Sequence, residues 1–303
     1  MKISTYHPFR SAKAKVEYLA LYDEAAKGWP VASECRMAST SYGQTFVRIS
    51  GPVDGPPLML LPGAAHCSLM WRPNIESLSE CYRTYAVDTL INTGCVGRSV
   101  YTRIIKGPGA AANWLDELFS ALSLEDGVNL VGMSYGGWLT SQYALRYPNR
   151  LDRIALLAPA ATVLPVRLEF YLRALLPGLV HVRFLHEHFL FWVFNDLAQE
   201  DAEMVADMAN HGLLAIRCFK PANYGMHVPP TVLRDEQLQS IRVPALFLVG
   251  ANEVLYCAQK AVQRLNAVAP CIETEVIPNA GHDLTFVQPE MVNQRILGFL
   301  TQS

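Results

Sequence analysis

Three polar residues, far apart in this 303-residue chain, have the types and the order that nucleophilic catalysis requires. Ser134 lies in the pentapeptide Gly132-Met133-Ser134-Tyr135-Gly136, and Glu253 and then His282 follow it along the chain. A serine hydroxyl is a weak nucleophile at neutral pH, so it needs a base beside it and an acid that orients the base. We therefore predict Ser134 as the nucleophile, His282 as the general base and Glu253 as the orienting acid.

The residues around the pentapeptide make this interpretation stronger than a chance G-x-S-x-G match. Residues 128–131 form an apolar run that predicts a buried strand, and the pattern from Ser134 to Tyr147 predicts a helix that Pro148 ends. A sharp strand-to-helix turn would present the serine, and side chains in place of its flanking glycines would collide with the neighbouring strand and helix. A serine that caps a helix in a glycine-rich turn is the alternative interpretation.

The base is expected on a loop after the last strand. His282 follows a strand predicted at 273–277 and precedes the final helix. Of the other seven histidines, only His66 is expected to approach the site, because it lies in a loop after an earlier strand. His186 and His188 form an H-x-H pattern whose side chains would point to different sides of a helix, so we expect no metal site there.

The acid is expected just beyond another strand. Glu253 follows a strand predicted at 245–249. The other position of this kind follows a strand predicted at 154–157, but the segment from Ala158 to Arg167 contains no carboxylate. Asp283, next to His282, is expected to point elsewhere. A solvated surface glutamate is the alternative interpretation of Glu253.

The oxyanion of an acyl-transfer intermediate needs backbone N–H donors, and the loss of one donor typically costs ~10²–10³ in rate. The first expected donor is the amide of Tyr135, directly after the nucleophile. The second should come from Pro62-Gly63-Ala64-Ala65, where Gly63 allows the backbone to pass close to a substrate. We predict the Ala64 amide, with Ala65 as its nearest rival.

Apolar strands that alternate with helices would position these residues and predict an α/β fold, with a largely parallel sheet covered on both faces. Strands are expected at 34–39, 45–50, 58–61, 85–87, 128–131, 154–157, 245–249 and 273–277, and helices at 11–27, 110–123, 134–147 and from Pro289.

Residues 161–240 interrupt this alternation with helix-like periodicity and many aromatic side chains. We predict a core of residues 1–160 and 241–303 and a helical cap of residues 161–240 over the site. Additional helical core is the alternative, and charges such as Arg173 and Asp196 argue against a membrane-resting surface.

Composition excludes several classes of function. The net charge of −2 argues against nucleic-acid binding, and the longest apolar run, residues 189–194, is far shorter than the roughly 20 residues that cross a bilayer. The start of the chain lacks the apolar stretch of a signal peptide. Seven cysteines without a C-x-x-C pair indicate reduced thiols. We expect a cytoplasmic protein without stable membrane insertion; nothing in the sequence specifies its oligomeric state.

Together these residues resemble the α/β-hydrolase superfamily over essentially the whole chain, and particularly its bacterial carboxylesterase-like members. The likeness includes Trp71-Arg72-Pro73-Asn74-Ile75, the histidine loop at 276–282 and the acid loop at 249–256, where Glu253 replaces the commoner aspartate. The resemblance implies the α/β-hydrolase fold and hydrolysis of small to medium hydrophobic esters. It also implies an acyl-serine intermediate at Ser134, with no cofactor or metal.

Two departures from the family pattern concern substrate preference. Pro62-Gly63 replaces the usual His-Gly of the oxyanion loop, and residues 89–99 replace a short turn that contains Asp-Gly. A lactonase, a C–C bond hydrolase or a cofactor-free perhydrolase would use the same three residues. Ser134 argues against the dehalogenases and epoxide hydrolases of this fold, which use an aspartate. A non-catalytic ligand-binding protein is a further alternative, although such proteins typically lose one of the three residues.

Overall fold

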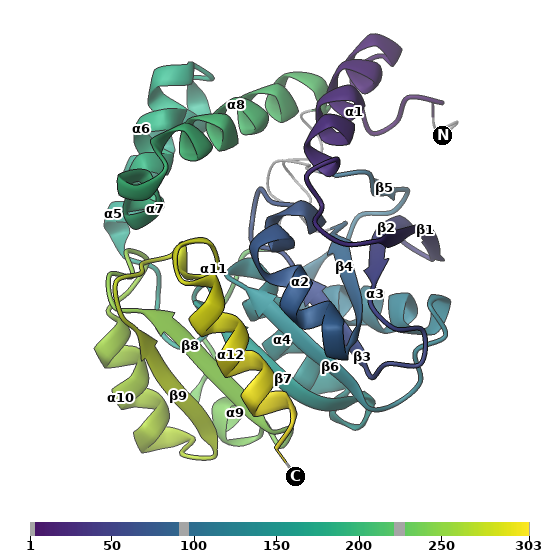
Figure 1. Ribbon diagram of the computed structural model, residues 1–303. Helices are drawn as coiled ribbons and strands as arrows, with labels where there is room; N and C mark the ends of the chain where they lie inside the picture. Colours follow the sequence, from purple (N-terminus) through teal and green to yellow (C-terminus); the bar gives the residue numbers. More distant parts are fainter. Residues whose placement is uncertain (1–3, 91–96, 221–227, 303) are drawn as a thin grey trace.

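A mostly parallel sheet runs through the centre of the protein (Figure 1). The computed structural model describes residues 4–90, 97–220 and 228–302, and within these ranges nine strands form one sheet. Eight follow the order β1-β2-β4-β3-β6-β7-β8-β9, and β5 pairs with β2. Strand β2 pairs antiparallel with β1, β4 and β5, and the remaining pairs are parallel. The bounds are Ser33–Thr40 (β1), Gly43–Ser50 (β2), Pro57–Leu61 (β3), Arg83–Asp88 (β4), Val100–Tyr101 (β5), Val128–Met133 (β6), Leu151–Leu157 (β7), Ala245–Gly250 (β8) and Ile272–Ile277 (β9).

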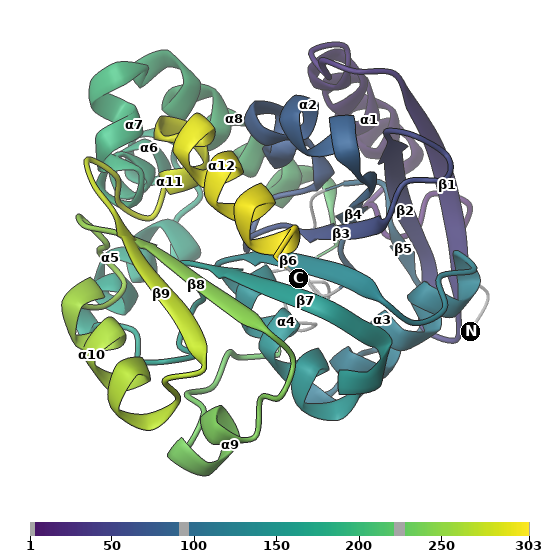
Figure 2. The same cartoon turned by 60° about the horizontal axis from the view of Figure 1, so that its bottom comes forward.

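Helices cover both faces of this sheet (Figure 2). Alternate residues of a strand point to opposite faces, so Leu58 and Leu60 of β3 pack in one apolar cluster, and Met59 and Leu61 pack in the other. The first cluster includes side chains of α1 (Ala12–Ala26), α2 (Arg72–Cys81) and α12 (Pro289–Leu300). The second includes side chains of α3 (Gly107–Ala121), α4 (Tyr135–Arg146) and α10 (Ala258–Val268).

The predicted fold class is confirmed, and each of the eight predicted strands is present. Helix α4 begins at Tyr135 rather than Ser134, because Ser134 has a backbone conformation that a helix does not contain. The two-residue strand β5 and helices α2 and α10 were not predicted. Helix α10 buries Ala258, Ala261 and Leu265, which recur at helical spacing on one face, so its sequence carries an amphipathic pattern that the prediction did not use.

A helical insertion separates β7 from β8, as predicted, and lies at the top of Figure 1. It contains α5 (Leu168–Leu179), α6 (Arg183–Val193), α7 (Asn195–Glu200) and α8 (Ala202–Cys218), and the short α9 (Asp235–Gln239) follows it. The far end of α8 reaches the N-terminal segment, where Arg10 Nε donates to the Phe219 carbonyl at 2.7 Å. The boundaries at 161 and 240 stay a prediction.

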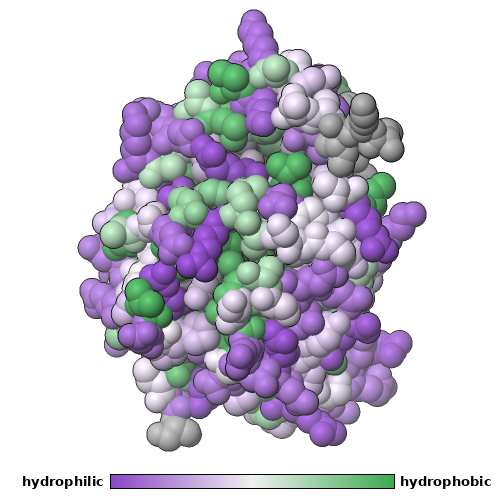
Figure 3. All heavy atoms as spheres, turned by 90° about the vertical axis from the view of Figure 1, so that its right-hand side faces the viewer, coloured by the Kyte–Doolittle hydropathy of each residue, from purple (hydrophilic) through white to green (hydrophobic). Residues whose placement is uncertain are grey.

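The insertion exposes a row of leucines on α5. Leu168 and Leu179 are each 70% exposed, and Leu172, Leu175 and Leu176 are also exposed. This helix lies on the left of Figure 1, whereas the opposite side of the protein mixes hydrophilic and hydrophobic residues (Figure 3). Among the described residues, no helix combines the length and the apolar character needed to cross a membrane.

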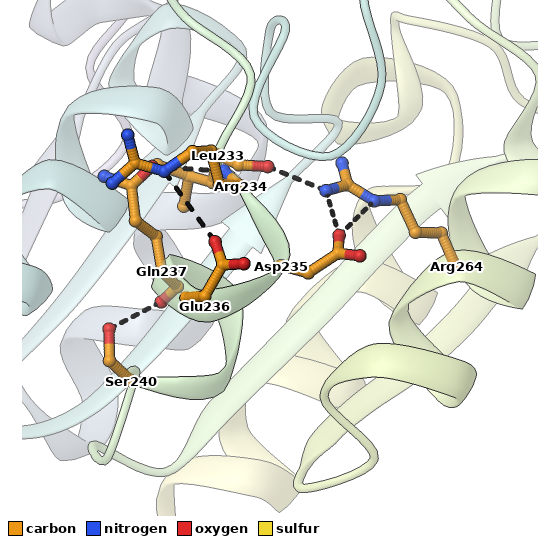
Figure 4. A network of polar contacts seen from close by, with 7 residues as sticks. All are labelled: Leu233, Arg234, Asp235, Glu236, Gln237, Ser240 and Arg264. Atoms are coloured by element: carbon orange, nitrogen blue, oxygen red, sulfur yellow. Dashed lines mark hydrogen bonds and ion pairs between the residues drawn. The ribbon is translucent and has the colours of Figure 1, made fainter.

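Arg264 of α10 joins the two ends of the insertion to the core, and Figure 4 shows its contacts with the segment after the insertion. Its guanidinium donates to the carbonyl of Val163, which follows β7. It also donates to the carbonyl of Leu233 at 2.8 Å and to the carboxylate of Asp235 at 2.5 Å, both after the insertion. One partly buried side chain therefore connects the segments that enter and leave the insertion.

We expect Arg264→Ala to lower the free energy of unfolding by about 2–3 kcal/mol, because hydrogen bonds to a charged group contribute about 1.5–3 kcal/mol. Urea denaturation measures the change. Arg234→Ala is the matched control, because the Arg234 side chain is 77% exposed and pairs with Glu236 at 3.7 Å. Its effect should stay below about 1 kcal/mol. Equal losses in the two variants would contradict the role of Arg264.

Candidate active site

Ser134 occupies a sharp turn between β6 and α4. Its φ of 52° and ψ of −112° lie in a region that residues with a side chain rarely adopt, so the turn is strained. The Ser134 N–H donates to the Leu157 carbonyl at 2.8 Å. The Ser134 carbonyl accepts from the amides of Trp138 and Ala160, each at 3.0 Å. These bonds to β7 and α4 hold the strained residue in place.

Two glycines make this turn sterically feasible. A Cβ on Gly132 would lie 2.2 Å from the Gly136 carbonyl oxygen, and a Cβ on Gly136 would lie 2.4 Å from the Leu61 carbonyl oxygen. Both distances are far below van der Waals contact, and both neighbours are backbone atoms that cannot rotate away. The turn therefore requires glycine at both positions, as the sequence motif predicts.

The structure brings Ser134, His282 and Glu253 into one hydrogen-bonded chain. His282 Nε2 lies 2.9 Å from Ser134 Oγ, and His282 Nδ1 lies 2.9 Å from Glu253 Oε2. The second oxygen of Glu253 accepts from the Leu255 amide at 2.8 Å. All three side chains are buried. With the proton of the ring on Nδ1, facing the carboxylate, Nε2 presents a lone pair to the serine hydroxyl.

The environment of His282 favours a positive charge on its ring. Burial alone lowers the pKa of His282, but the charge of Glu253 and its hydrogen bond to the ring raise it, and Asp283 adds to this effect. The result is a pKa above the ordinary value of 6.5. The imidazolium that forms when the ring accepts a proton is therefore stabilised.

The candidate oxyanion donors lie on either side of Ser134. Tyr135 is the first residue of α4, so its N–H lies at the positive end of the helix dipole. The loop after β3, residues 62–67, carries the second candidate donor and is named the oxyanion loop. It approaches Ser134 at Gly63, where a Cβ would lie 3.4 Å from Ser134 Cβ. The Gly63 amide donates to Met70 Sδ at 3.2 Å, so this amide is already engaged. Ala64, the next residue, is half-buried, whereas Ala65 is exposed and has a φ of 58°.

His66 lies near the site, as expected from the sequence, but the nitrogen beside Ser134 Oγ comes from His282. The His66 ring packs edge-on against Phe194 at 5.7 Å and near Phe286 at 6.2 Å between centroids. Desolvation, with a smaller effect of His282, lowers the pKa of His66 to about 4. His66 is therefore neutral at physiological pH.

The loops that carry Glu253 and His282 are bonded to the insertion. Asn252 Nδ2 donates to both carboxylate oxygens of Asp196, at 3.0 and 3.1 Å. Asp283 is buried and accepts from the Leu197 amide at 2.8 Å and from the Gly281 amide at 3.0 Å. The neighbours of the predicted acid and base thus hold α7 against the site. Sequence analysis missed this clamp, although it correctly expected Asp283 to point away from His282.

Asp88 anchors a second set of loops beside the site. Its buried carboxylate accepts from the Tyr22 hydroxyl at 3.0 Å, from the Ser68 amide at 2.8 Å and from the Arg98 amide at 2.8 Å. Desolvation raises the pKa of Asp88 above its ordinary value. Asp88 therefore joins helix α1, the segment at Ser68 and the segment that begins at residue 97. Of the predicted 89–99 loop, residues 91–96 lie outside the described part of the chain.

The described residues contain no group of three or more His, Cys, Asp or Glu side chains that could hold a metal ion. Six cysteines fall within the described ranges, and none forms a disulfide. Cys95 lies outside those ranges.

We expect Asp283→Asn to destabilise the protein by about 1–3 kcal/mol, because the amide would present an N–H to one of two buried backbone donors. Asp54→Asn, in an exposed turn, is the matched control and should change the free energy of unfolding by less than about 0.5 kcal/mol. Chemical denaturation of both variants measures the difference. A neutral Asp283→Asn would show that the clamp carries little stability.

Comparison with known proteins places this arrangement in context. The profile of the alpha/beta hydrolase family matches residues 58–295, which include Ser134, Glu253 and His282. A Bacillus subtilis protein named as an uncharacterized carboxylesterase, Nap, is 39% identical over 284 residues, 94% of this chain and 92% of its own length. The carboxylesterase YbfK of the same organism is 33% identical over 298 residues, 96% of each chain.

A solved structure agrees with these sequence relatives. The crystal structure of naproxen esterase (carboxylesterase NP) from Bacillus subtilis superimposes with a TM-score of 0.87 at 36% identity. The match covers 96% of this chain and all of the other. Similarity at this level includes the sheet, both helical layers and the insertion.

Proposed function

The chain belongs to the alpha/beta hydrolase family as a carboxylesterase-like member, and from this premise we propose that it hydrolyses carboxylic esters of small to medium hydrophobic compounds at Ser134. The observation that carries the proposal is the chain of two 2.9 Å hydrogen bonds from Ser134 through His282 to Glu253. A binding protein would have no need for a strained serine whose hydroxyl faces a basic nitrogen.

In the first half-reaction, His282 Nε2 accepts the hydroxyl proton of Ser134 as Oγ attacks the ester carbonyl. The carbonyl oxygen becomes an oxyanion, for which we assign the amides of Ala64 and Tyr135 as donors. The intermediate then collapses: the bond from the carbonyl carbon to the alcohol oxygen breaks, and His282 gives its proton to the leaving oxygen. An alcohol departs, and the acyl group remains on Ser134.

In the second half-reaction, water takes the place of the alcohol. His282 Nε2 accepts a proton from the water as its oxygen attacks the acyl carbon, and the same donors stabilise the second oxyanion. Collapse breaks the bond to Ser134 Oγ, which takes the proton back from His282, and a carboxylic acid is released. Glu253 keeps the ring in the required tautomer and offsets the positive charge in both half-reactions.

The six described cysteines without disulfides also support the proposal that the enzyme works in the reducing cytoplasm.

A substrate panel tests the reaction class. We expect aryl and alkyl esters of short acids, and a naproxen ester as the name of the relative suggests, to be hydrolysed with the highest kcat/KM. The kcat/KM should be at least about tenfold lower for simple lactones. It should be equally low for dienoic acids, in which a C–C bond would have to be cleaved. A lactone or a dienoic acid as the best substrate would contradict the proposal.

We expect Ser134→Ala to lower kcat by about 10⁴–10⁶-fold, because the residues of such a site act as a unit. The fold should remain, since alanine removes only the hydroxyl. Release of nitrophenol from nitrophenyl butyrate measures the loss, and Ser120→Ala on the exposed face of α3 is the matched control, expected to keep full activity. More than a few per cent of the parental rate in pure Ser134→Ala protein would remove this residue from the mechanism.

The value of kcat/KM should fall at low pH, and this acid limb should have an apparent pKa above 6.5. The reaction requires neutral His282, and the pKa of His282 is raised. A raised folded-state pKa means that protonation of His282 stabilises the fold. This contribution is complete below the unfolded-state pKa and is lost as pH rises through the folded-state pKa. Activity should therefore increase over the same pH window in which this part of the stability disappears.

Glu253→Gln should lower kcat by up to about 10⁴-fold and also move the acid limb below pH 6.5. The carboxylate is the main group that raises the pKa of His282; without it, burial, only partly offset by Asp283, would lower that pKa. Glu253→Asp keeps the charge and is the matched control, expected to keep the acid limb near its parental position. An unshifted limb in Glu253→Gln would assign the pKa to another group.

A further inference from the structure

A cavity of about 120 Å³ lies between α1, the oxyanion loop and α8. Figure 1 shows the end of α8 beside α1, above the core. The lining includes Tyr18 and Tyr22 of α1, Met70 near the oxyanion loop, Met208 and Gly212 of α8, and Phe286 of α11 (Leu284–Val287). Ser134 is not among its lining residues, so the cavity lies beside the nucleophile rather than around it.

The oxyanion loop connects the cavity with the nucleophile. Ala65 and His66 line the cavity. The point that a Cβ on Gly63 would occupy lies 3.4 Å from Ser134 Cβ and 3.7 Å from His66 Cδ2. The edge of the His66 ring and Ser134 Cβ thus both lie close to the space that Gly63 leaves free of a side chain. A substituent of an ester at Ser134 that passed Gly63 would reach His66, which lines the cavity.

The lining favours an uncharged group of about one aromatic ring. An apolar protein cavity of about 150 Å³ is known to bind benzene. The cavity described here has a similar volume, about 120 Å³. Burial disfavours charge on titratable groups of the lining, since it lowers the pKa of His66 to about 4, lowers the pKa of His211 and raises the pKa of the Cys67 thiol. The cation Arg72 is exposed at the edge, where its Nη1 donates to the Ala25 carbonyl at 3.3 Å.

The position of the cavity relative to His282 indicates which half of the ester enters it. His282 must protonate the leaving oxygen, so the alcohol portion begins beside His282 Nε2. The ring of His66 lies 6.2 Å from that of Phe286 between centroids, and both residues line the cavity. Phe286 belongs to α11, which begins two residues after His282. The cavity therefore opens on the side of the site where the alcohol portion starts.

We propose that this cavity is the subsite for the alcohol portion of the substrate and that it accepts a neutral group the size of a benzyl ring. The proposal rests on the proposed ester hydrolysis and adds a substrate class to it: acetates and similar esters of arylmethyl alcohols. Gly212 keeps the subsite open. A Cβ on Gly212 would meet no atom within 4 Å, although this residue lies inside α8 and lines the cavity.

Gly212→Leu tests the subsite, because it would place a branched side chain in the cavity without displacing backbone. The substrates are ethyl acetate, benzyl acetate and ethyl phenylacetate, which carry no ring, a ring on the alcohol and a ring on the acid. We expect Gly212→Leu to lower kcat/KM for benzyl acetate by at least about tenfold, the size of effect that a changed apolar pocket produces. The other two esters should stay within about twofold of the parent.

The matched control is Gly298→Leu on α12, because a Cβ there also meets no atom within 4 Å and the residue is remote from the cavity. Its kcat/KM should be parental for all three esters. A Gly212→Leu protein that loses ethyl phenylacetate instead of benzyl acetate would overturn the assignment to the alcohol portion. Unchanged values for all three esters would overturn the subsite.

Direct binding separates failure of this subsite from failure of the proposed reaction. In the parental protein with ¹³C-labelled methionine methyl groups, benzyl alcohol should shift the signals of Met70 and Met208, which line the cavity. The same titration should leave these signals unshifted in Gly212→Leu. A parental protein whose Met70 and Met208 signals do not respond would overturn the subsite even if all three esters are hydrolysed. A response without ester hydrolysis would retain the binding site and reject the esterase reaction.

Discussion

The left-handed backbone at Ser134 is the constraint on which the arrangement of the site depends. Only a turn this sharp presents the hydroxyl above the end of β6, and it exists because Gly132 and Gly136 leave no Cβ where backbone carbonyls lie 2.2 and 2.4 Å away. β6 lies between β3 and β7 near the middle of the sheet. The loops that follow the parallel strands β3, β8 and β9 therefore converge on the same edge as Ser134.

The electrostatics of the site depend on its connection to the insertion. Glu253, 2.9 Å from the His282 ring, is the main group that raises the pKa of His282. Asn252 and Asp283, the immediate neighbours of the acid and the base, are bonded to Asp196 and Leu197 of the insertion. A displacement of α7 would move the loops that carry Glu253 and His282, so the position of the insertion and the geometry of these two residues are physically coupled.

The sequence allowed the central sheet and the three aligned side chains to be predicted, because each side chain lies in the loop or turn after a predicted strand. Tyr135 and Ala64 were assigned by the same reasoning and stay proposals as oxyanion donors. The clamp could not be predicted: Asn252 and Asp196 are 56 positions apart, and Leu197 and Asp283 are 86 apart. No local pattern encodes such pairs. The cavity was also beyond prediction, since it depends on how α8 packs against α1.

We propose that His282 and Glu253 make Ser134 an acyl acceptor, and covalent labelling of the serine measures this activation. The intact protein is treated with a fluorophosphonate, which traps activated serines, and its digest is sequenced by mass spectrometry. We expect one adduct per chain, located on Ser134, with labelling strongly slowed in His282→Ala. An adduct at another residue, or an unlabelled Ser134 in folded protein, would show that these residues do not activate Ser134.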